Sequence, residues 1–370
     1  PILRNLRAAA TALALGTAVL GVSAAFHAAS AQNVSPAVGG PLTEAKTLAA
    51  AKRFQEASSR VNAAAAAAKT PTENAAVKQM RDYLAVASGD TSTPLGAKAK
   101  FAADANAGKW REVIAGADIL KKMNALDTQS QVVVAQAYYR LNDSKNCMSY
   151  IRNNRLSGES ALALLQRCAY DAGDEVTQRQ SLEQLVATTG KAEHWKNLLR
   201  LAERSKGIKD HQTLDLYRLK ALTGNLTTGD EVSTYAQLAL LMKFPAEAQA
   251  VVQKGLTDKI LAPSERTTRL MKLATDRAAE SAAGAAKALD AAQKAPQGDA
   301  LVQIGEEQIG LGKAKDAIAT VQAGIAKKPA DAANAQLRLG TAYLAAGQKG
   351  EAGRAFNAVK GDEKWVMIAH

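Results

Sequence analysis

Two stretches near the C-terminal end of this 370-residue chain decide its fold: LVQIGEEQIGLGKAKDAIATV at residues 301–321 and QLRLGTAYLAAGQKGEAGRAF at residues 336–356. Each has a large residue followed by Gly, a second Gly seven residues later, and then Ala and a large residue four apart. The matched positions, each 35 residues apart, are Ile304 and Leu339, Gly305 and Gly340, Gly312 and Gly347, Ala317 and Ala352, and Val321 and Phe356. A fixed offset of this size predicts a repeat array in which each unit contacts its neighbours.

The second stretch resembles the tetratricopeptide repeat, because Leu339-Gly340-x-x-Tyr343 is followed by Ala352-x-x-x-Phe356. The Trp of that pattern is absent, and Gln308 replaces the aromatic in the earlier copy. The resemblance implies an all-α, right-handed superhelical solenoid of stacked antiparallel helix pairs. It also implies that the first helix of each pair lines a concave face.

Weaker copies of the pattern extend the array towards the N-terminus. The key positions 100, 134, 165, 198, 235, 270, 304 and 339 are 31 to 37 residues apart. We therefore predict about eight helix pairs over residues 95–365, with one unit at 270–295. Residues 42–94 are predicted to form two additional N-terminal helices, and Pro and Gly predict a linker at 32–41.

Capping motifs and amino-acid composition also predict that the chain is helical. Thr70-Pro71-Thr72-Glu73 and Thr228-Gly229-Asp230-Glu231 are capping-box starts, and Pro245 and Ser264 mark two further starts. Runs typical of strands are nearly absent. At 370 residues the chain is also longer than one compact core, which usually stops growing near ~250–300 residues.

Residues 1–31 are predicted to be a signal peptide that is cleaved after Ala31. Arg4 and Arg7 precede the apolar stretch Ala8–Phe26, and Ala29-Ser30-Ala31 supplies small residues for cleavage. The alternative is a retained membrane anchor, but the stretch is dominated by Ala and interrupted by polar residues. The sequence thus favours a periplasmic protein, with membrane contact only through an uncleaved signal.

The charge is strongly positive. The net charge of +12 falls to +10 when residues 1–31 with their two Arg are removed. This excess favours anionic partners, such as an acidic protein face, a polysaccharide or lipid head groups. Nucleic acid is not expected, because no basic run with interleaved aromatics occurs.

Two cysteines, Cys147 and Cys168, are present. An even pair in an exported protein favours a disulfide, and the alternative is two buried small apolar residues. In the repeat register, Cys147 lies in the second helix of one unit and Cys168 in the first helix of the next, so a bridge between neighbours fits the resemblance.

No motif for catalysis, a metal or a cofactor is found. His194 and His211 are 17 residues apart with no third ligand at metal spacing, and we expect them at the surface or an interface. The paired carboxylates Glu306 and Glu307 are expected on a solvated helix face. We therefore predict a protein that is not an enzyme and that uses no cofactor.

The predicted binding surface is the first helix of each pair, as the resemblance implies. By helical spacing from the key positions it is basic with two tyrosines, although ordinary solvated charges are the alternative interpretation. Its members are Gln136, Tyr139, Arg140, Arg167, Tyr170, Lys196, Arg200, Arg204 and Lys272.

Three functions are considered for this protein, and the third is an enzyme of an unrecognised class. The first is a scaffold or adaptor for protein–protein interaction in an envelope-associated assembly. The second is a direct binder of an anionic polysaccharide or lipid through a basic concave face.

Overall fold

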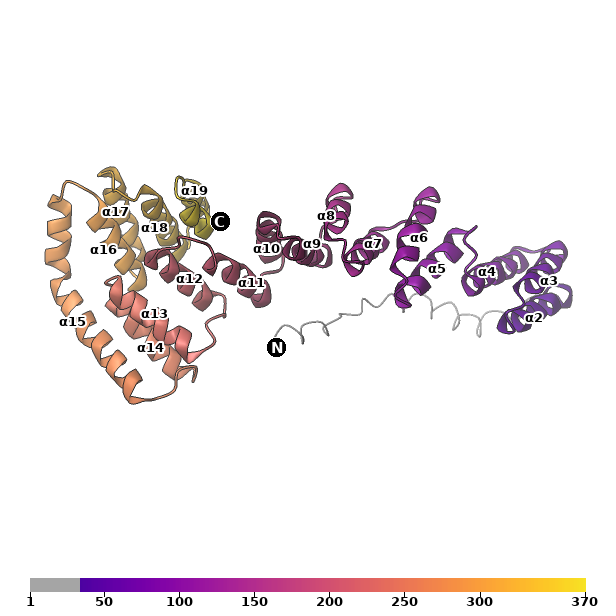
Figure 1. Ribbon diagram of the computed structural model, residues 1–370, viewed down its shortest axis with the longest axis horizontal. Helices are drawn as coiled ribbons and strands as arrows, with labels where there is room; N and C mark the ends of the chain where they lie inside the picture. The colour runs from indigo at the N-terminus through magenta and orange to yellow at the C-terminus, as the bar shows by residue number, and fades with distance from the viewer. Residues whose placement is uncertain (1–33) are drawn as a thin grey trace. The chain divides into compact units, whose positions relative to one another are not determined.

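The computed structural model describes residues 34–370, so the predicted signal peptide lies outside the described residues. The described part is helical throughout and contains no strand (Figure 1). It forms two compact units, which meet in the chain at Ser181 and Leu182. No helix within residues 34–370 is long and apolar enough to cross a membrane.

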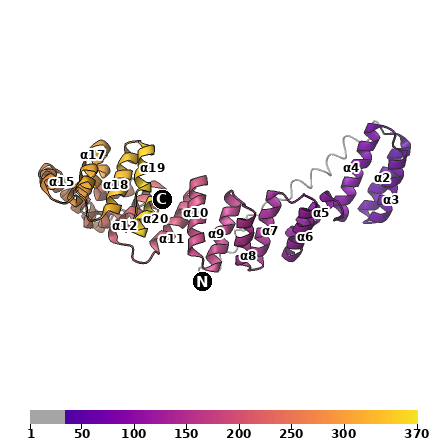
Figure 2. The same ribbon diagram turned by 90° about the horizontal axis from the view of Figure 1, so that it is seen from above.

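The first unit is a succession of helices in which each packs against the next, as α5 to α9 show in Figures 1 and 2. Its helices are α2 (Pro36–Ala50), α3 (Phe54–Ala67), α4 (Pro71–Ser88), α5 (Pro94–Asn106), α6 (Trp110–Lys122), α7 (Thr128–Arg140), α8 (Ser144–Asn153) and α9 (Glu159–Ala172); α10 (Glu175–Thr189) crosses the boundary between the units.

The second unit contains the repeat that opened the sequence. Its helices are α11 (Ala192–Glu203), α12 (Asp210–Leu222), α13 (Gly229–Leu241), α14 (Pro245–Thr257), α15 (Glu265–Lys294), α16 (Asp299–Gly310), α17 (Ala314–Ala326), α18 (Ala332–Ala345), α19 (Lys349–Asn357) and α20 (Glu363–Ala369).

Large residues pack against small ones in both C-terminal helix pairs. Gly305 of α16 faces Val321 of α17, and Gly340 of α18 faces the ring of Phe356 in α19; a methyl group on either glycine would overlap its partner. After each first helix the chain reverses through a Gly with positive φ, Gly312 at 74° and its counterpart 35 residues on at 76°. The predicted all-α array of helix pairs is confirmed.

The local start signals are also confirmed. The Thr70 hydroxyl accepts a hydrogen bond from the Glu73 amide at 3.2 Å, and the Glu73 carboxylate accepts one from the Thr70 amide at 3.0 Å. The same capping box is present at Thr228 and Glu231, at the start of α13. These helices begin where the sequence predicts, because caps depend only on residues three apart.

The N-terminal region differs from the prediction. The predicted linker at 32–41 is wrong over its second half, since α2 begins at Pro36, where a proline fits the first turn. Val38, Leu42, Ala45 and Ala49 lie on one face of α2 and are buried against α3 and α4. That burial outweighs the backbone hydrogen bond that Pro41 removes. The region thus contains three helices rather than two.

The unit predicted at 270–295 is a single helix and not a pair. α15 runs for 30 residues from Glu265 to Lys294 and has no residue with positive φ. Its sequence is rich in Ala, Lys, Arg and Glu, which favour helix, and Gly284 alone does not break it. The predicted series of pairs is therefore interrupted by α15 and ends with another single helix, α20.

Candidate functional site

Five of the predicted binding residues lie on two helices of the first unit that pack against each other, α7 and α9. Arg140, Arg167 and Tyr170 are exposed, and 57% of the Tyr170 surface is open to solvent. Gln136 and Tyr139 are half-buried. We call this set, Gln136, Tyr139, Arg140, Arg167 and Tyr170, the α7–α9 face.

The side chains of the α7–α9 face are supported by an aromatic ring, a buried cluster and a disulfide. The Arg140 guanidinium lies 5.9 Å from the centroid of the Trp110 ring on α6, which positions the charge. Tyr139 packs on a buried cluster that contains Cys147 and Cys168. These two cysteines, on α8 and α9, form a disulfide with a Cα–Cα distance of 6.4 Å, and neither is exposed. The face is thus supported by a covalent link between neighbouring helices.

The other predicted binding residues belong to the second unit and do not form one group. Lys196 and Arg200 are exposed one turn apart on α11, and Arg204 is exposed at its end. Lys272 lies on α15, which packs against α14 and α16, and its Nζ atom is 2.8 Å from the Asp276 carboxylate. The charge of Lys272 is therefore paired on its own helix.

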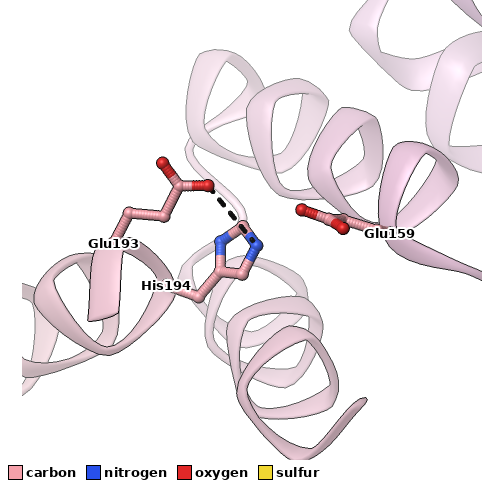
Figure 3. A group of neighbouring side chains, drawn as sticks. All are labelled: Glu159, Glu193 and His194. Carbon is pink, nitrogen blue, oxygen red and sulfur yellow. Dashed lines mark ion pairs between the residues drawn. The ribbon is translucent and has the colours of Figure 1, made fainter. Parts of the chain in front are cut away.

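Both histidines singled out in the sequence lie at interior or half-buried positions of the second unit. His194 is 7% exposed, and its Nε2 atom is 3.9 Å from the neighbouring Glu193 carboxylate (Figure 3). His211 lies with its Nε2 atom 2.9 and 3.0 Å from the two Glu306 oxygens. The Trp365 ring of α20 meets the His211 ring edge-on at 5.5 Å. His211 thus lies at an interface between α12, α16 and α20, as one of the two expected positions, surface or interface, allows.

The most unexpected feature of the second unit is a group of charged side chains in its interior, which we call the inner ion cluster. The expectation that Glu306 lies on a solvated face is wrong, since only 3% of the residue is exposed. The members of the cluster are His211, Asp215 and Arg218 on α12, Glu247 on α14, Glu306 on α16 and Arg338 on α18.

Two arginines hold the inner ion cluster together. Arg338, 2% exposed, donates to Asp215 through both terminal nitrogens and to the Asn334 amide oxygen at 2.8 Å, and it lies 3.2 Å from Glu306. Arg218 donates to both Glu247 oxygens, at 2.7 and 2.6 Å, and also to Asp215 and Glu306. Every buried carboxylate in the cluster thus has a guanidinium partner, which buried charges require.

The electrostatics of the cluster follow from this pairing. Burial alone would raise the pKa of Glu306, but the charges of Arg338 and Arg218 hold it well below its ordinary value. Burial would lower the pKa of Arg218, yet its hydrogen bonds to Glu247 and the nearby carboxylates raise it instead. The Glu306 carboxylate and the Arg218 and Arg338 guanidinium groups are therefore charged at physiological pH, and their ion pairs join α12, α16 and α18.

The inner ion cluster joins α12 to several other helices in the interior of the second unit. Through it α12 contacts α14, α16 and α18, and Gln212 of α12 approaches Asp362, the residue before α20, at 3.4 Å. Figure 1 shows α12 between α13 and α14 on one side and α16 and α18 on the other. The side chains of Glu306 on α16 and Arg338 on α18 are thus buried against the charged side chains of α12.

Sequence reasoning missed this cluster. Arg338 and Glu306 occupy different positions of their 35-residue units, so no periodic signal joins them. Arg218 bonds to Glu306 over 88 residues and Arg338 bonds to Asp215 over 123 residues, with no local pattern to mark either contact.

No family model and no curated protein matches the chain. Among solved structures it is similar to the crystal structure of the APC/C hetero-tetramer Cut9-Hcn1, with 12% identity and a TM-score of 0.25, over 80% of this chain and 64% of that chain. It is also similar to the crystal structure of the P58(IPK) TPR domain, with 14% identity and a TM-score of 0.23, over 90% of this chain and 96% of that chain. Because both TM-scores are low, the fold assignment rests on the helix pairs themselves: the chain is an all-α array with tetratricopeptide-like packing.

Proposed function

We propose that this protein is a non-catalytic periplasmic scaffold that holds protein partners in an envelope-associated assembly through the α7–α9 face. One observation carries the proposal: this face presents exposed Arg140, Arg167 and Tyr170 on two helices that pack against each other. Exposed Tyr and Arg are residue types enriched in protein interfaces.

The periplasmic location rests on two features. The signal-like segment at residues 1–31 favours export, and the Cys147–Cys168 disulfide suits an oxidising compartment. Cell fractionation followed by N-terminal sequencing tests this part. We expect the protein in the periplasmic fraction with Gln32 as its first residue; a cytoplasmic protein that retains residues 1–31 would contradict it.

Photo-crosslinking in intact cells tests the scaffold. A benzoylphenylalanine at Tyr170 should yield defined crosslinked protein partners. The same probe at Leu222, which is 80% exposed in the second unit, is the matched control. Partners captured equally from both positions, or from neither, would contradict a role of the α7–α9 face.

An anionic polysaccharide or lipid is the second candidate, because the net charge without residues 1–31 is +10 and Arg140 and Arg167 are exposed. Binding to vesicles with anionic lipid, or to an acidic polysaccharide, should then weaken with salt. It should weaken as well in Arg140→Ala/Arg167→Ala but not in the control Arg277→Ala on α15. Equal binding by all three proteins would exclude this candidate.

A further inference from the structure

The first unit contains a cavity that the proposed function does not use. It has a volume of about 360 Å³ and lies between α6, α7 and α8. Cavities that hold ligands in proteins are typically ~300–1,000 Å³. Its polar lining comes from Asp118 and Lys121 on α6, Asn124 after α6, Gln131 and Tyr138 on α7, and Tyr150 and Asn154 at the end of α8. None of these residues belongs to the α7–α9 face.

One wall of the cavity is aromatic. The rings of Tyr138 and Tyr150 have centroids 5.8 Å apart and are tilted by 45°. Burial, followed by the charge of Asp118, raises the pKa of Tyr138, and burial raises that of Tyr150 to about 12. Both phenols are therefore neutral at physiological pH, and their ring faces attract a cation.

A negative charge lies close to this wall. Asp118 lines the same cavity as Tyr138 and Tyr150, and its charge contributes, after burial, to the raised pKa values of both tyrosines. Asp118 is exposed and has no ion-pair partner within residues 34–370. A carboxylate and neutral tyrosine rings in the lining of one cavity are a combination that binds a guanidinium or ammonium group.

The rest of the polar lining suits a peptide. Asn154 donates its amide hydrogen to the Tyr150 carbonyl at 2.8 Å, so its side-chain oxygen is left as an acceptor. The amide of Gln131 lies in the same lining. Amide side chains pair with the backbone N–H and C=O groups of a ligand.

We propose that this cavity binds an arginine side chain of a protein partner. The guanidinium pairs with Asp118 and lies against the rings of Tyr138 and Tyr150, and the flanking peptide groups bond to Gln131 and Asn154. Arginine fits better than lysine because its planar group both stacks on aromatic rings and pairs with a carboxylate. The inference goes beyond the proposed function, since this site attracts a cation and the α7–α9 face is basic.

Calorimetric titration of the full chain tests the proposal. The probe is the peptide acetyl-Gly-Arg-Gly-amide, and the control peptide carries citrulline, which keeps the shape of arginine without its charge. We expect binding of the arginine peptide with a Kd of about 1 mM and at least about tenfold weaker binding of the citrulline peptide, since a charge-assisted bond is lost.

Two substitutions should act in opposite directions. Asp118→Asn should weaken binding of the arginine peptide about tenfold, whereas Lys121→Gln should tighten it a few-fold by removing a like charge from the cavity. Both positions are exposed, so neither change should unfold the protein. Asp82→Asn on α4, an exposed carboxylate whose partner is Lys78, is the matched control and should leave the Kd unchanged.

Three results would overturn the proposal. These are equal binding of the arginine and citrulline peptides, an unchanged Kd in Asp118→Asn, and binding of agmatine as tight as that of the peptide. Agmatine carries the guanidinium without peptide groups, so the last result would assign the cavity to a small free cation. Loss of crosslinking at Tyr170 would not bear on this site, and Arg140→Ala/Arg167→Ala should leave the peptide affinity unchanged.

Discussion

The inner ion cluster leads to a sharp prediction about stability. Arg338→Met keeps most of the side-chain volume but removes the charge that bonds to Asp215 and Glu306. The side chains of these two carboxylates are only 6% and 2% exposed, so water cannot replace the lost partner. Removing one member of a buried ion pair typically costs about 3–5 kcal/mol.

The contacts that remain in Arg338→Met indicate where in this range the loss of unfolding free energy should lie. Arg218 still bonds to Asp215 and Glu306 after the change, so neither carboxylate loses every partner. We therefore expect the lower end, about 3 kcal/mol. With a urea dependence of about 2 kcal/mol per M, the unfolding midpoint should fall by about 1.5 M.

Two measurements distinguish a loss of stability in the second unit from one in the first unit. Trp365 fluorescence, measured in a Trp110→Phe/Trp195→Phe background, reports the site directly, because the Arg338 guanidinium lies 5.6 Å from the centroid of the Trp365 ring. Hydrogen exchange should accelerate in α12, α16 and α18 but not in α7 or α8, which belong to the first unit.

The matched control is Lys272→Met, which breaks an exposed pair with Asp276 and should cost about 0.5 kcal/mol or less. Adding Asp215→Asn to Arg338→Met should recover part of the loss, because it removes one of the two buried carboxylates that have lost a guanidinium partner. The reasoning is refuted if Arg338→Met costs no more than the control, or if exchange accelerates equally in both units.

Three further predictions concern other parts of the chain. Replacing Cys147 and Cys168 with Ser should destabilise the first unit by about 3 kcal/mol in urea unfolding, because the disulfide closes a loop with a sequence separation of 21; a midpoint equal to that of the parent would contradict this. Hydrogen bonds from Ser35, Lys69 and Thr70 lower the pKa of Glu73 to about 2 from 4.5, so its contribution to the stability of α2–α4 is complete above pH 4.5 and is lost as the pH falls towards 2; hydrogen exchange against pH should show this loss, and Glu73→Gln should abolish it. Gly340→Ala should cost about 1–3 kcal/mol because the new methyl group overlaps a packed ring, whereas Gly353→Ala, with open space around it, should be neutral or stabilising in the same thermal melts.

The sequence by itself determined the features that depend on near neighbours. The capping boxes at Thr70 and Thr228 act over three residues, and the packing of Gly340 against Phe356 acts within one helix pair. Such interactions leave a mark at fixed spacing, which is why the all-α array and many helix starts could be predicted. The same local reasoning placed the two cysteines on adjacent helices.

Only the tertiary structure decided which charges are buried. Glu306 and Arg338 are residue types of a solvated surface, and they lie inside because Asp215 and Arg218 of α12 pair with them. Likewise, Asp118 meets Tyr150 only after three helices pack around one cavity. These contacts join residues whose sequence separation follows no fixed period. The free-energy cost of burying a charge also depends on which ion-pair partners surround it in the folded structure.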